Sequence, residues 1–279
     1  MSDKPINLEA ITVRLAQSPK EVEAVQRLRY KVFYEELAAI PSPEMEKSKR
    51  DINEFDDVAD ILIVLDNEIE NPDERIVGTY RLLRQDIAEK YGHFYTSDEY
   101  DISALEKSGE KLLEVGRSCV LEPYRTRALI QKMWARIASY VAEHQVGLMF
   151  GCASFPGTDV SAIEKELSYL YHYHLADESQ CPVVLPQHRV DMNLIPKEEL
   201  DAKRVFSGLP PLIKGYLRLG ASIGDGAFID RQWNSVDVCI VMPTVQVTER
   251  YARHYQRDTE KNIPKNQALA EKLAAEGRS

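Results

Sequence analysis

Two long segments of the chain carry apolar residues at the spacing of an amphipathic helix. The first follows an S-x-x-E capping box at Ser18 and Glu21, has Pro19 at the first helical position, and extends to about residue 37. The second covers residues 126–143. Shorter apolar stretches predict helices near residues 87–91, after residue 159 and over residues 210–221.

Apolar runs rich in β-branched residues predict strands between these helices. The runs at 61–66 and 75–83 are joined by a turn at 71–73, and this pattern predicts an antiparallel pair. Further strands are predicted at 111–121, 146–154 and 182–195, with a closing strand at 237–243. Residues 38–60 show no periodicity and are interpreted as a long surface loop.

The order of these elements predicts a mixed α/β, or α+β, fold around one sheet. A length of 279 residues is enough to bury a core without disulfides or metals, and one domain over residues 1–256 is the simplest interpretation. The tail at 257–279 is rich in Glu, Lys and Ala with little apolar periodicity. We expect a solvated or frayed helix there.

Charge and cysteine content narrow the class of protein. A formal net charge of -10 argues against nucleic-acid binding, because neutralising phosphates needs a surplus of Lys and Arg. The chain does not start like a signal peptide, and no apolar run approaches the length of about 18 residues that spans a bilayer. The four cysteines are far apart without a C-x-x-C pair. We expect a cytoplasmic protein with free thiols.

An acidic cluster lies in the predicted loop. Glu54, Asp56 and Asp57 surround a single aromatic residue, Phe55. Such a cluster would suit a cationic substrate that carries an amine. The alternative interpretation is a solvated acidic loop without a ligand.

Three charged residues interrupt apolar strands, where an unpaired charge would be costly. They are Arg81 in the strand at 75–83, and Glu114 and Arg117 in the strand at 111–121. They could bind a ligand, or they could form structural ion pairs with one another. Strict alternation would place Glu114 and Arg117 on opposite faces. We hypothesise that Gly116 hosts a β-bulge that brings both toward one side.

Basic residues gather at the start of the helix predicted at 126–143. Arg125 and Arg127 lie at its entry, and Lys132 and Arg136 lie one turn apart along it. A helix N-terminus favours anions through its dipole and free N–H groups, so a phosphate or an acidic protein surface would dock there. The alternative is a solvated basic face.

Other chemistries have no support in the motifs. His172 and His174 are two positions apart on a predicted helix and therefore point in different directions, so no metal site is expected. The chain has no G-x-S-x-G elbow, no P-loop and no G-x-G-x-x-G fingerprint. Nucleophile-elbow hydrolysis, P-loop phosphoryl transfer and dinucleotide binding are not indicated.

Several motifs resemble a known family. RLRYKVFYEE, NEFDD, VGTYRLL and EVGRSCV occur in the order and spacing of the acyl-homoserine lactone synthases and their GNAT relatives. ASFPGTD, LSYLYHYHLA, LPPLIKGYLRLGASIGDGAFID and DVCIVM resemble the ornithine-acyl carrier protein N-acyltransferases, also called hemolysin-like proteins. The resemblance covers residues 10–256, and the part specific to the ornithine branch begins near residue 155.

The resemblance implies a GNAT fold whose central strands splay to admit a pantetheine arm, with EVGRSCV as a splayed strand. It associates Glu54, Asp56, Arg81, Glu114 and Arg117 with the active cleft, together with Asp57 of the acidic motif. Arg29 and Phe33 fall on the helix that covers this cleft and are expected to contact substrate.

The implied reaction is attack of the ornithine α-amine on an acyl thioester. The amine must lose a proton, so a carboxylate acts as general base, with Glu54 as first choice and Glu114 as second. Arg81 and Arg117 would position the base or bind the substrate carboxylate. Strand N–H groups near 117–119 would stabilise the oxyanion. No metal, nucleotide or other cofactor is required.

The resemblance also implies a donor. Many GNAT proteins wrap the pyrophosphate of CoA with Q/R-x-x-G-x-G/A, whereas here Ala128 and Ile130 stand at the glycine positions. This departure favours acyl carrier protein, with its single phosphopantetheine phosphate, as the co-substrate. Carrier proteins are acidic, so Arg125, Arg127, Lys132 and Arg136 are the expected docking patch.

Two other functions stay open at this point. One is an acyl-homoserine lactone synthase that uses S-adenosylmethionine, although that family lacks the PPLIKGYLRLGA region. The other is a non-catalytic module that binds acyl carrier protein or membranes. Transient contact with the inner membrane, through residues 210–220, is expected if the product is an amphiphile, and a buried core helix is the alternative for that segment.

Overall fold

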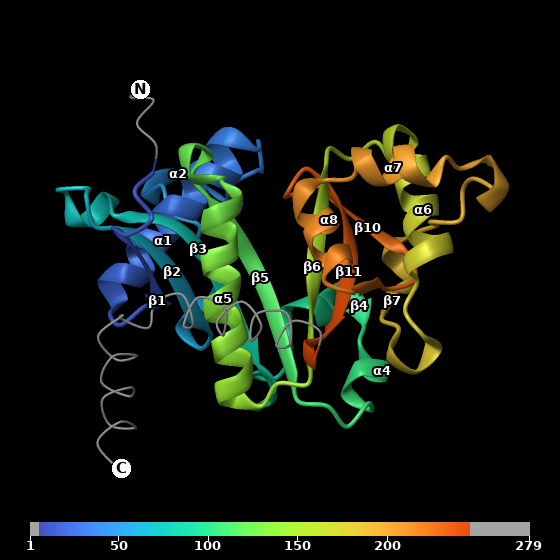
Figure 1. Ribbon diagram of the computed structural model, residues 1–279, viewed down its shortest axis with the longest axis horizontal. Helices are drawn as coiled ribbons and strands as arrows, with labels where there is room; N and C mark the ends of the chain where they lie inside the picture. The colour runs from blue at the N-terminus through green and yellow to red at the C-terminus, as the bar shows by residue number, and fades with distance from the viewer. Residues whose placement is uncertain (1–5, 246–279) are drawn as a thin grey trace, which may run out of the picture.

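The computed structural model describes residues 6–245 (Figure 1). Its helices are α1 (Pro19–Tyr30), α2 (Pro43–Ser48), α3 (Gln85–Tyr91), α4 (Ser103–Glu106), α5 (Arg127–His144), α6 (Glu164–His174), α7 (Ala202–Gly208) and α8 (Pro211–Arg218). Its strands are β1 (Ile11–Leu15), β2 (Asp60–Asp66), β3 (Ile76–Arg84), β4 (Tyr100–Asp101), β5 (Leu112–Val120), β6 (Leu148–Pro156), β7 (Val183–Val184), β8 (Arg189–Val190), β9 (Ser222–Ile223), β10 (Ala227–Asp230) and β11 (Ser235–Pro243).

One large mixed sheet organises the molecule. Its strand order is β1-β2-β3-β5-β6-β11-β10-β8, with β9 paired to β11. All neighbours on this path are antiparallel except β5 and β6, which are parallel and joined by α5. The predicted mixed sheet is confirmed, and the last strand, β11, lies inside it between β6 and β10.

The sheet divides between β5 and β6. These strands pair only from Leu112 opposite Leu148 to Glu114 opposite Phe150, and then diverge into two arms (Figure 1). Gly151 follows directly, with φ of +152°, and a Cβ there would lie 2.2 Å from the Val115 carbonyl oxygen. Only glycine permits this approach. The predicted splay is therefore confirmed.

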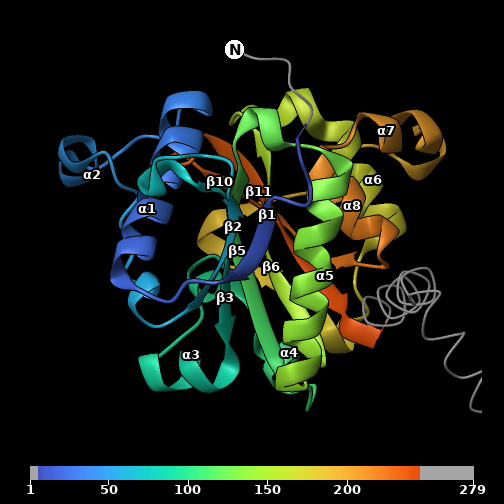
Figure 2. The same cartoon turned by 60° about the vertical axis from the view of Figure 1, so that its left-hand side comes forward.

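Helices cover both faces of the first arm, which explains the continuous apolar run of β2 (Figure 2). Leu62 and Val64 belong to the core that contains the apolar residues of α5. Ile61 and Ile63 pack on the other side, with Val25 of α1. Alternating residues of β2 thus pack toward α5 on one face of the sheet and toward α1 on the other.

An aromatic contact bridges the two arms on the α5 side. The Trp134 ring of α5 lies 6.1 Å from Tyr80 of β3 and 5.7 Å from Tyr216 of α8, both edge to face. The Tyr80 and Tyr216 hydroxyls are 3.4 Å apart. Helix α8 is therefore part of the core, and its Ile213, Tyr216 and Leu217 are buried.

The first predicted helix is two elements. Ser18 accepts a hydrogen bond from the Glu21 N–H, as the capping box predicts, and α1 ends at Tyr30. A π-helix, Lys31–Glu36, continues it. Such π-helical turns are frequent at functional sites because they change which side chains face inward.

The segment predicted as a surface loop is partly buried. It contains α2 and a 3-10 turn, Glu54–Asp57, and Asp51, Phe55 and Asp56 are buried. The loop prediction was wrong for these residues because Arg29 anchors them. Arg29 Nη1 donates to Asp56 at 2.8 Å, Nη2 binds the same carboxylate, and Nε lies 2.8 Å from Asp51.

The remaining segments were predicted with mixed success. The helices near 87–91, after 159 and at 210–221 are confirmed as α3, α6 and α8. The strand at 182–195 was wrong, since only β7 and β8, of two residues each, form there. The tail at 257–279 lies outside the described residues. None of the helices between residues 6 and 245 is long and apolar enough to span a bilayer.

The Arg29 anchor allows a test of stability. We expect Arg29→Met to lower the free energy of unfolding by about 3–5 kcal/mol, because Asp51 and Asp56 would remain buried without a counter-charge. Arg27→Met, on the same helix, removes an exposed pair with Glu23 at 3.7 Å and should cost about 1 kcal/mol or less. Urea denaturation of both variants measures the difference. Equal losses would show that the anchor does not hold the loop.

Candidate functional site

A β-bulge prepares the edge of β5 that faces the opening. Thr79 pairs with Cys119 and Arg81 with Gly116, so β5 carries one residue more than β3 between these pairs. The extra residue is Arg117, which has φ of 49°. Glu114 and Arg117 consequently line the same cavity. The predicted bulge is confirmed, with Arg117 rather than Gly116 in the left-handed conformation.

Two adjoining cavities occupy the opening between the arms. The inner cavity, of about 270 Å³, lies between the β3–β5 wall and the β6–β11 wall. The outer cavity, of about 950 Å³, lies between the N-terminal half of α5 and α8. Both are lined by Phe33, Leu37, Ser118, Leu212 and Tyr216. They therefore adjoin, and we call the two cavities together the passage, which extends from the N-terminus of α5 to the strand edge.

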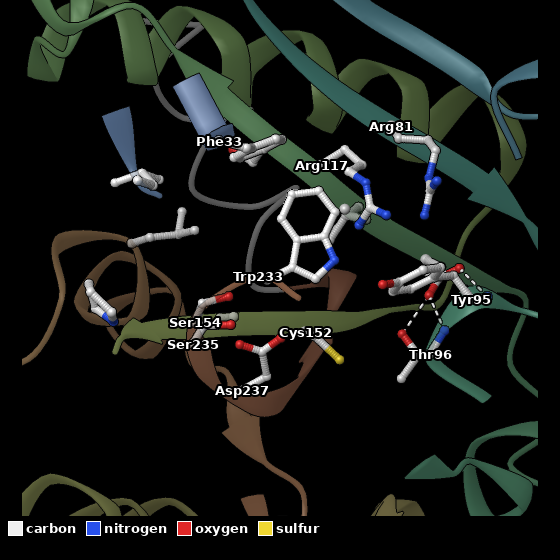
Figure 3. Close-up of a pocket in the computed structure, with 18 of the residues that line it drawn as sticks. Phe33, Arg81, Tyr95, Thr96, Arg117, Cys152, Ser154, Trp233, Ser235 and Asp237 are labelled. Carbon is white, nitrogen blue, oxygen red and sulfur yellow. Dashed lines mark hydrogen bonds between the residues drawn. The ribbon is translucent and has the colours of Figure 1, made fainter. Parts of the chain in front are cut away.

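Two arginines form the charged part of the β3–β5 wall (Figure 3). Arg81 donates to the Asn53 side chain at 2.6 Å, and its guanidinium lies 5.2 Å from the Tyr95 ring. Arg117 lies 4.7 Å from Tyr95 and 4.3 Å from Trp233. Burial, followed by the charge of Arg117, lowers the pKa of Arg81 to about 10. Both guanidiniums stay charged at neutral pH and are held by aromatic rings.

Glu114 is the carboxylate of this wall, and backbone groups hold it. One oxygen accepts from the Tyr95 N–H at 3.0 Å, and the other accepts from the Thr96 N–H at 2.7 Å and from the Thr96 hydroxyl. The residue is 3% exposed. A carboxylate can accept about four hydrogen bonds, so these three donors leave a lone pair of Glu114 available to a ligand in the cavity.

The β6–β11 wall carries groups that sequence reasoning missed (Figure 3). Cys152, Ser154, Ser235 and Asp237 line the inner cavity on this side. Burial raises the pKa of Asp237 to about 6. The signal was available, because Asp237 interrupts an apolar strand as Arg81 does.

Two further acids lie behind Asp237. Carboxylate oxygens of Glu99, Asp230 and Asp237 are all within 4.8 Å of one another. Burial, and then the charge of Asp237, raise the pKa of Glu99 to about 8, and Glu99 accepts a hydrogen bond from the Cys152 thiol at 3.1 Å. Asp230 accepts from the backbone of Gln232 and Trp233. The cluster is close enough to hold a cation.

The remaining predicted site residues, from the first helical segment and the acidic motif, differ in whether they line a cavity. Phe33 lines both cavities. Arg29 and Asp56 are buried in their mutual ion pair, so they support the site and do not line it. Glu54 and Asp57 are exposed and outside both cavity linings. The acidic motif therefore contributes the Arg29 anchor rather than a cavity wall.

The four basic residues of the proposed docking patch also separate. Arg125 and Arg127 line the outer cavity, and Arg125 pairs with Glu36 at 2.5 Å. Lys132 donates to the carbonyls of Leu8 and Ile11, and Arg136 pairs with Glu143. Arg125 and Arg127 therefore flank the outer cavity, whereas Lys132 and Arg136 lie outside its lining.

The two histidines contact different groups, as their spacing predicts. His172 Nε2 lies 2.9 Å from the Ile195 carbonyl, and His174 Nε2 lies 3.1 Å from the Tyr169 hydroxyl. The described cysteines Cys119, Cys152, Cys181 and Cys239 are free thiols.

This chain matches a known domain family and is similar in sequence to known proteins. Residues 28–135 match the acetyltransferase (GNAT) domain model. An L-ornithine N(alpha)-acyltransferase from Rhizobium meliloti is 43% identical over 255 residues, which cover 90% of this chain and 85% of that protein. The L-ornithine N(alpha)-acyltransferase from Rhodobacter capsulatus is 41% identical over 261 residues, which cover 93% and 99%.

A solved structure with some similarity is an N-acyl amino acid synthase from uncultured soil microbes, with a TM-score of 0.47, 12% identity and coverage of 85% of this chain and 92% of that chain.

The sequence relatives decide the assignment, because their identity is high over nearly the whole length of both chains. This chain is an acyltransferase with a GNAT domain and belongs to the L-ornithine N(alpha)-acyltransferase family.

Proposed function

We propose that this chain transfers a 3-hydroxyacyl group from acyl carrier protein to the α-amine of L-ornithine, giving lyso-ornithine lipid. The names of its relatives support ornithine as the acceptor. The observation that carries the proposal is the passage from the N-terminus of α5 to a strand edge beside Arg81, Arg117 and Glu114. An acyl thioester and an amino acid can meet there.

The outer cavity supports entry of the donor arm. Its walls are mostly apolar, and it runs along Ser118, Cys119 and Val120 at the edge of β5. Among the described residues, this edge has no strand partner on the β6 side, because pairing ends at Glu114. Its peptide groups could bind the amides of a pantetheine arm as a missing strand would.

The helix entry supports docking of a single phosphate. Thr126 caps α5, and Arg125 and Arg127 lie at the mouth of the outer cavity. The helix dipole and these two charges would attract a phosphate and the acidic surface of a carrier protein. Ile130 lines the mouth where the CoA-binding motif has a glycine. Its side chain limits wrapping of a pyrophosphate, which favours the carrier protein as donor.

The proposed chemistry is direct attack. The neutral ornithine α-amine attacks the thioester carbon while Glu114, directly or through water, takes one proton from its nitrogen. N–H groups at the bulged edge of β5 stabilise the oxyanion of the tetrahedral intermediate. The C–S bond then breaks, and the pantetheine thiolate leaves and takes up the proton. Arg81 or Arg117 binds the ornithine carboxylate.

The positions of Glu54 and Glu114 change which of them we propose as the general base. Glu114 is buried in the inner cavity, whereas Glu54 is exposed and outside its lining. A base must be within reach of the proton that it removes. We therefore assign the base to Glu114 in place of Glu54.

Contact with a membrane remains part of the proposal, since the product would be an amphiphile. Helix α8 is a poor candidate for this contact, because its apolar residues pack in the core or line the outer cavity.

One assay tests the proposed function. Purified protein is incubated with 3-hydroxyacyl carrier protein and ornithine, lysine, glutamine or S-adenosylmethionine, and products are identified by mass. We expect N-acylornithine as the main product. A lactone from S-adenosylmethionine would favour a homoserine lactone synthase instead, and no product with any acceptor would favour a binding module.

Paired variants distinguish the two candidate bases. We expect Glu114→Gln to lower kcat by about 10²–10⁴, the usual contribution of a general base, while thermal melting confirms that the variant is folded. Glu54→Gln should lower kcat by less than about threefold, because an exposed carboxylate outside the cavity cannot reach the amine. The opposite ranking would return the role to Glu54.

Charge reversal tests docking of the carrier. We expect Arg125→Glu with Arg127→Glu to raise the KM for acyl carrier protein about tenfold or more with little change in kcat, and to weaken its salt dependence. The matched control reverses Lys90 and Lys107, which are exposed on α3 and next to α4. An equal effect in both double variants would show that only net charge matters.

A further inference from the structure

The inner cavity has a net positive wall, where Arg81 and Arg117 outnumber Glu114, and a negative wall. Arg81 and Arg117 belong to β3 and β5, and Asp237 belongs to β11 on the other arm of the split sheet (Figure 3). Trp233 lies between them, with its ring 4.3 Å from the Arg117 guanidinium. A ligand that fills this cavity would meet cationic groups on one side and a carboxylate on the other.

Two buried side chains on the β6–β11 wall, Ser235 and Asp237, have incomplete hydrogen bonding. Asp237 is 6% exposed and Ser235 is 4% exposed, and both line the cavity. By distance and angle, Oδ1 of Asp237 and Oγ of Ser235 form no hydrogen bond within residues 6–245, although the nearby hydroxyls of Ser154 and Ser235 act to lower the pKa of Asp237. A buried acceptor without a donor is costly, so these atoms are arranged for a donor that arrives with a ligand.

The surroundings of Asp237 favour a cation as that donor. Glu99 and Asp230 place further carboxylate oxygens within 4.8 Å. Burial raises the pKa of both Asp237 and Glu99, which reflects the cost of gathering negative charge without a counter-ion. A bound ammonium group would supply that counter-ion and up to three N–H donors.

We infer that Asp237, assisted by Ser235 and Glu99, binds the side-chain ammonium of a diamino acid and selects it over neutral amino acids. This inference rests on the proposed function. The α-amine must lie near the β5 edge, where the thioester would end, and the α-carboxylate would lie beside Arg81 and Arg117. The side chain then extends past Trp233 toward the opposite wall, where its ammonium meets Asp237.

The test compares L-ornithine with L-norvaline, which has the same carbon chain and lacks the δ-amine. With acyl carrier protein as donor, we expect kcat/KM of the unaltered protein to favour ornithine by at least about 100-fold, because norvaline leaves the buried carboxylate unpaired. In Asp237→Asn the preference should fall below about tenfold, through loss of ornithine activity with norvaline activity retained. Ser235→Ala should reduce the preference by a smaller factor.

The matched control is Asp225→Asn, which makes the same change at a surface carboxylate that pairs with Arg189 at 3.0 Å. It should keep the full preference for ornithine. Equal use of both amino acids by the unaltered protein would overturn the inference while leaving acyl transfer intact. Equal loss of both activities in a folded Asp237→Asn variant would assign Asp237 to the reaction itself and also overturn it.

Two other outcomes are separable. A preference for ornithine that disappears with EDTA and returns with Ca²⁺ or Mg²⁺ would assign the carboxylates to a metal ion and contradict an ammonium site. Failure of the unaltered protein to acylate any amino acid would overturn the proposed function, and this result is distinct from acylation without selectivity.

Discussion

The molecule depends on the end of pairing between β5 and β6. Three residue pairs join β5 to β6, and Gly151 lets the two backbones approach where they part. Beyond that point β5 presents an unpaired edge inside the protein. Backbone groups without partners are costly when buried, so such an edge is stable only where water or a ligand satisfies it. The split thus creates both the passage and the need for an occupant.

Buried charges stabilise the site through a connected set of partners. Asp51 lies 2.8 Å from Arg29 and 3.6 Å from Arg117, and it accepts a hydrogen bond from Tyr34 at 3.0 Å. It therefore joins the anchor of the acidic loop to the wall of the inner cavity. Buried ion pairs add little net stability, but they fix geometry when every partner is present. We infer that this network keeps Arg117 in place at the strand edge.

The split also distributes the charged groups unevenly between the two arms. The first arm supplies arginines and Glu114, and the second arm supplies hydroxyls and the Asp237 cluster. Because Arg81, Glu114 and Asp237 are buried, their charges act at a lower effective dielectric constant than in water. A substrate with a carboxylate and two amines matches this arrangement better than a neutral amino acid does.

Periodicity and composition determined most of the elements, because α5, β2, β3, β5 and β6 have apolar patterns that local sequence carries. A charge inside an apolar strand was enough to select Arg81, Glu114 and Arg117. Tertiary structure alone decided which acids face the cavity. Glu54 and Asp57 share a local acidic motif with Asp56. Of these three acids, Arg29 binds only Asp56 and draws it inward, so Glu54 and Asp57 stay exposed. Asp237 and Glu99 are distant in sequence, and they meet because β11 pairs with β6, whose Cys152 thiol donates to Glu99.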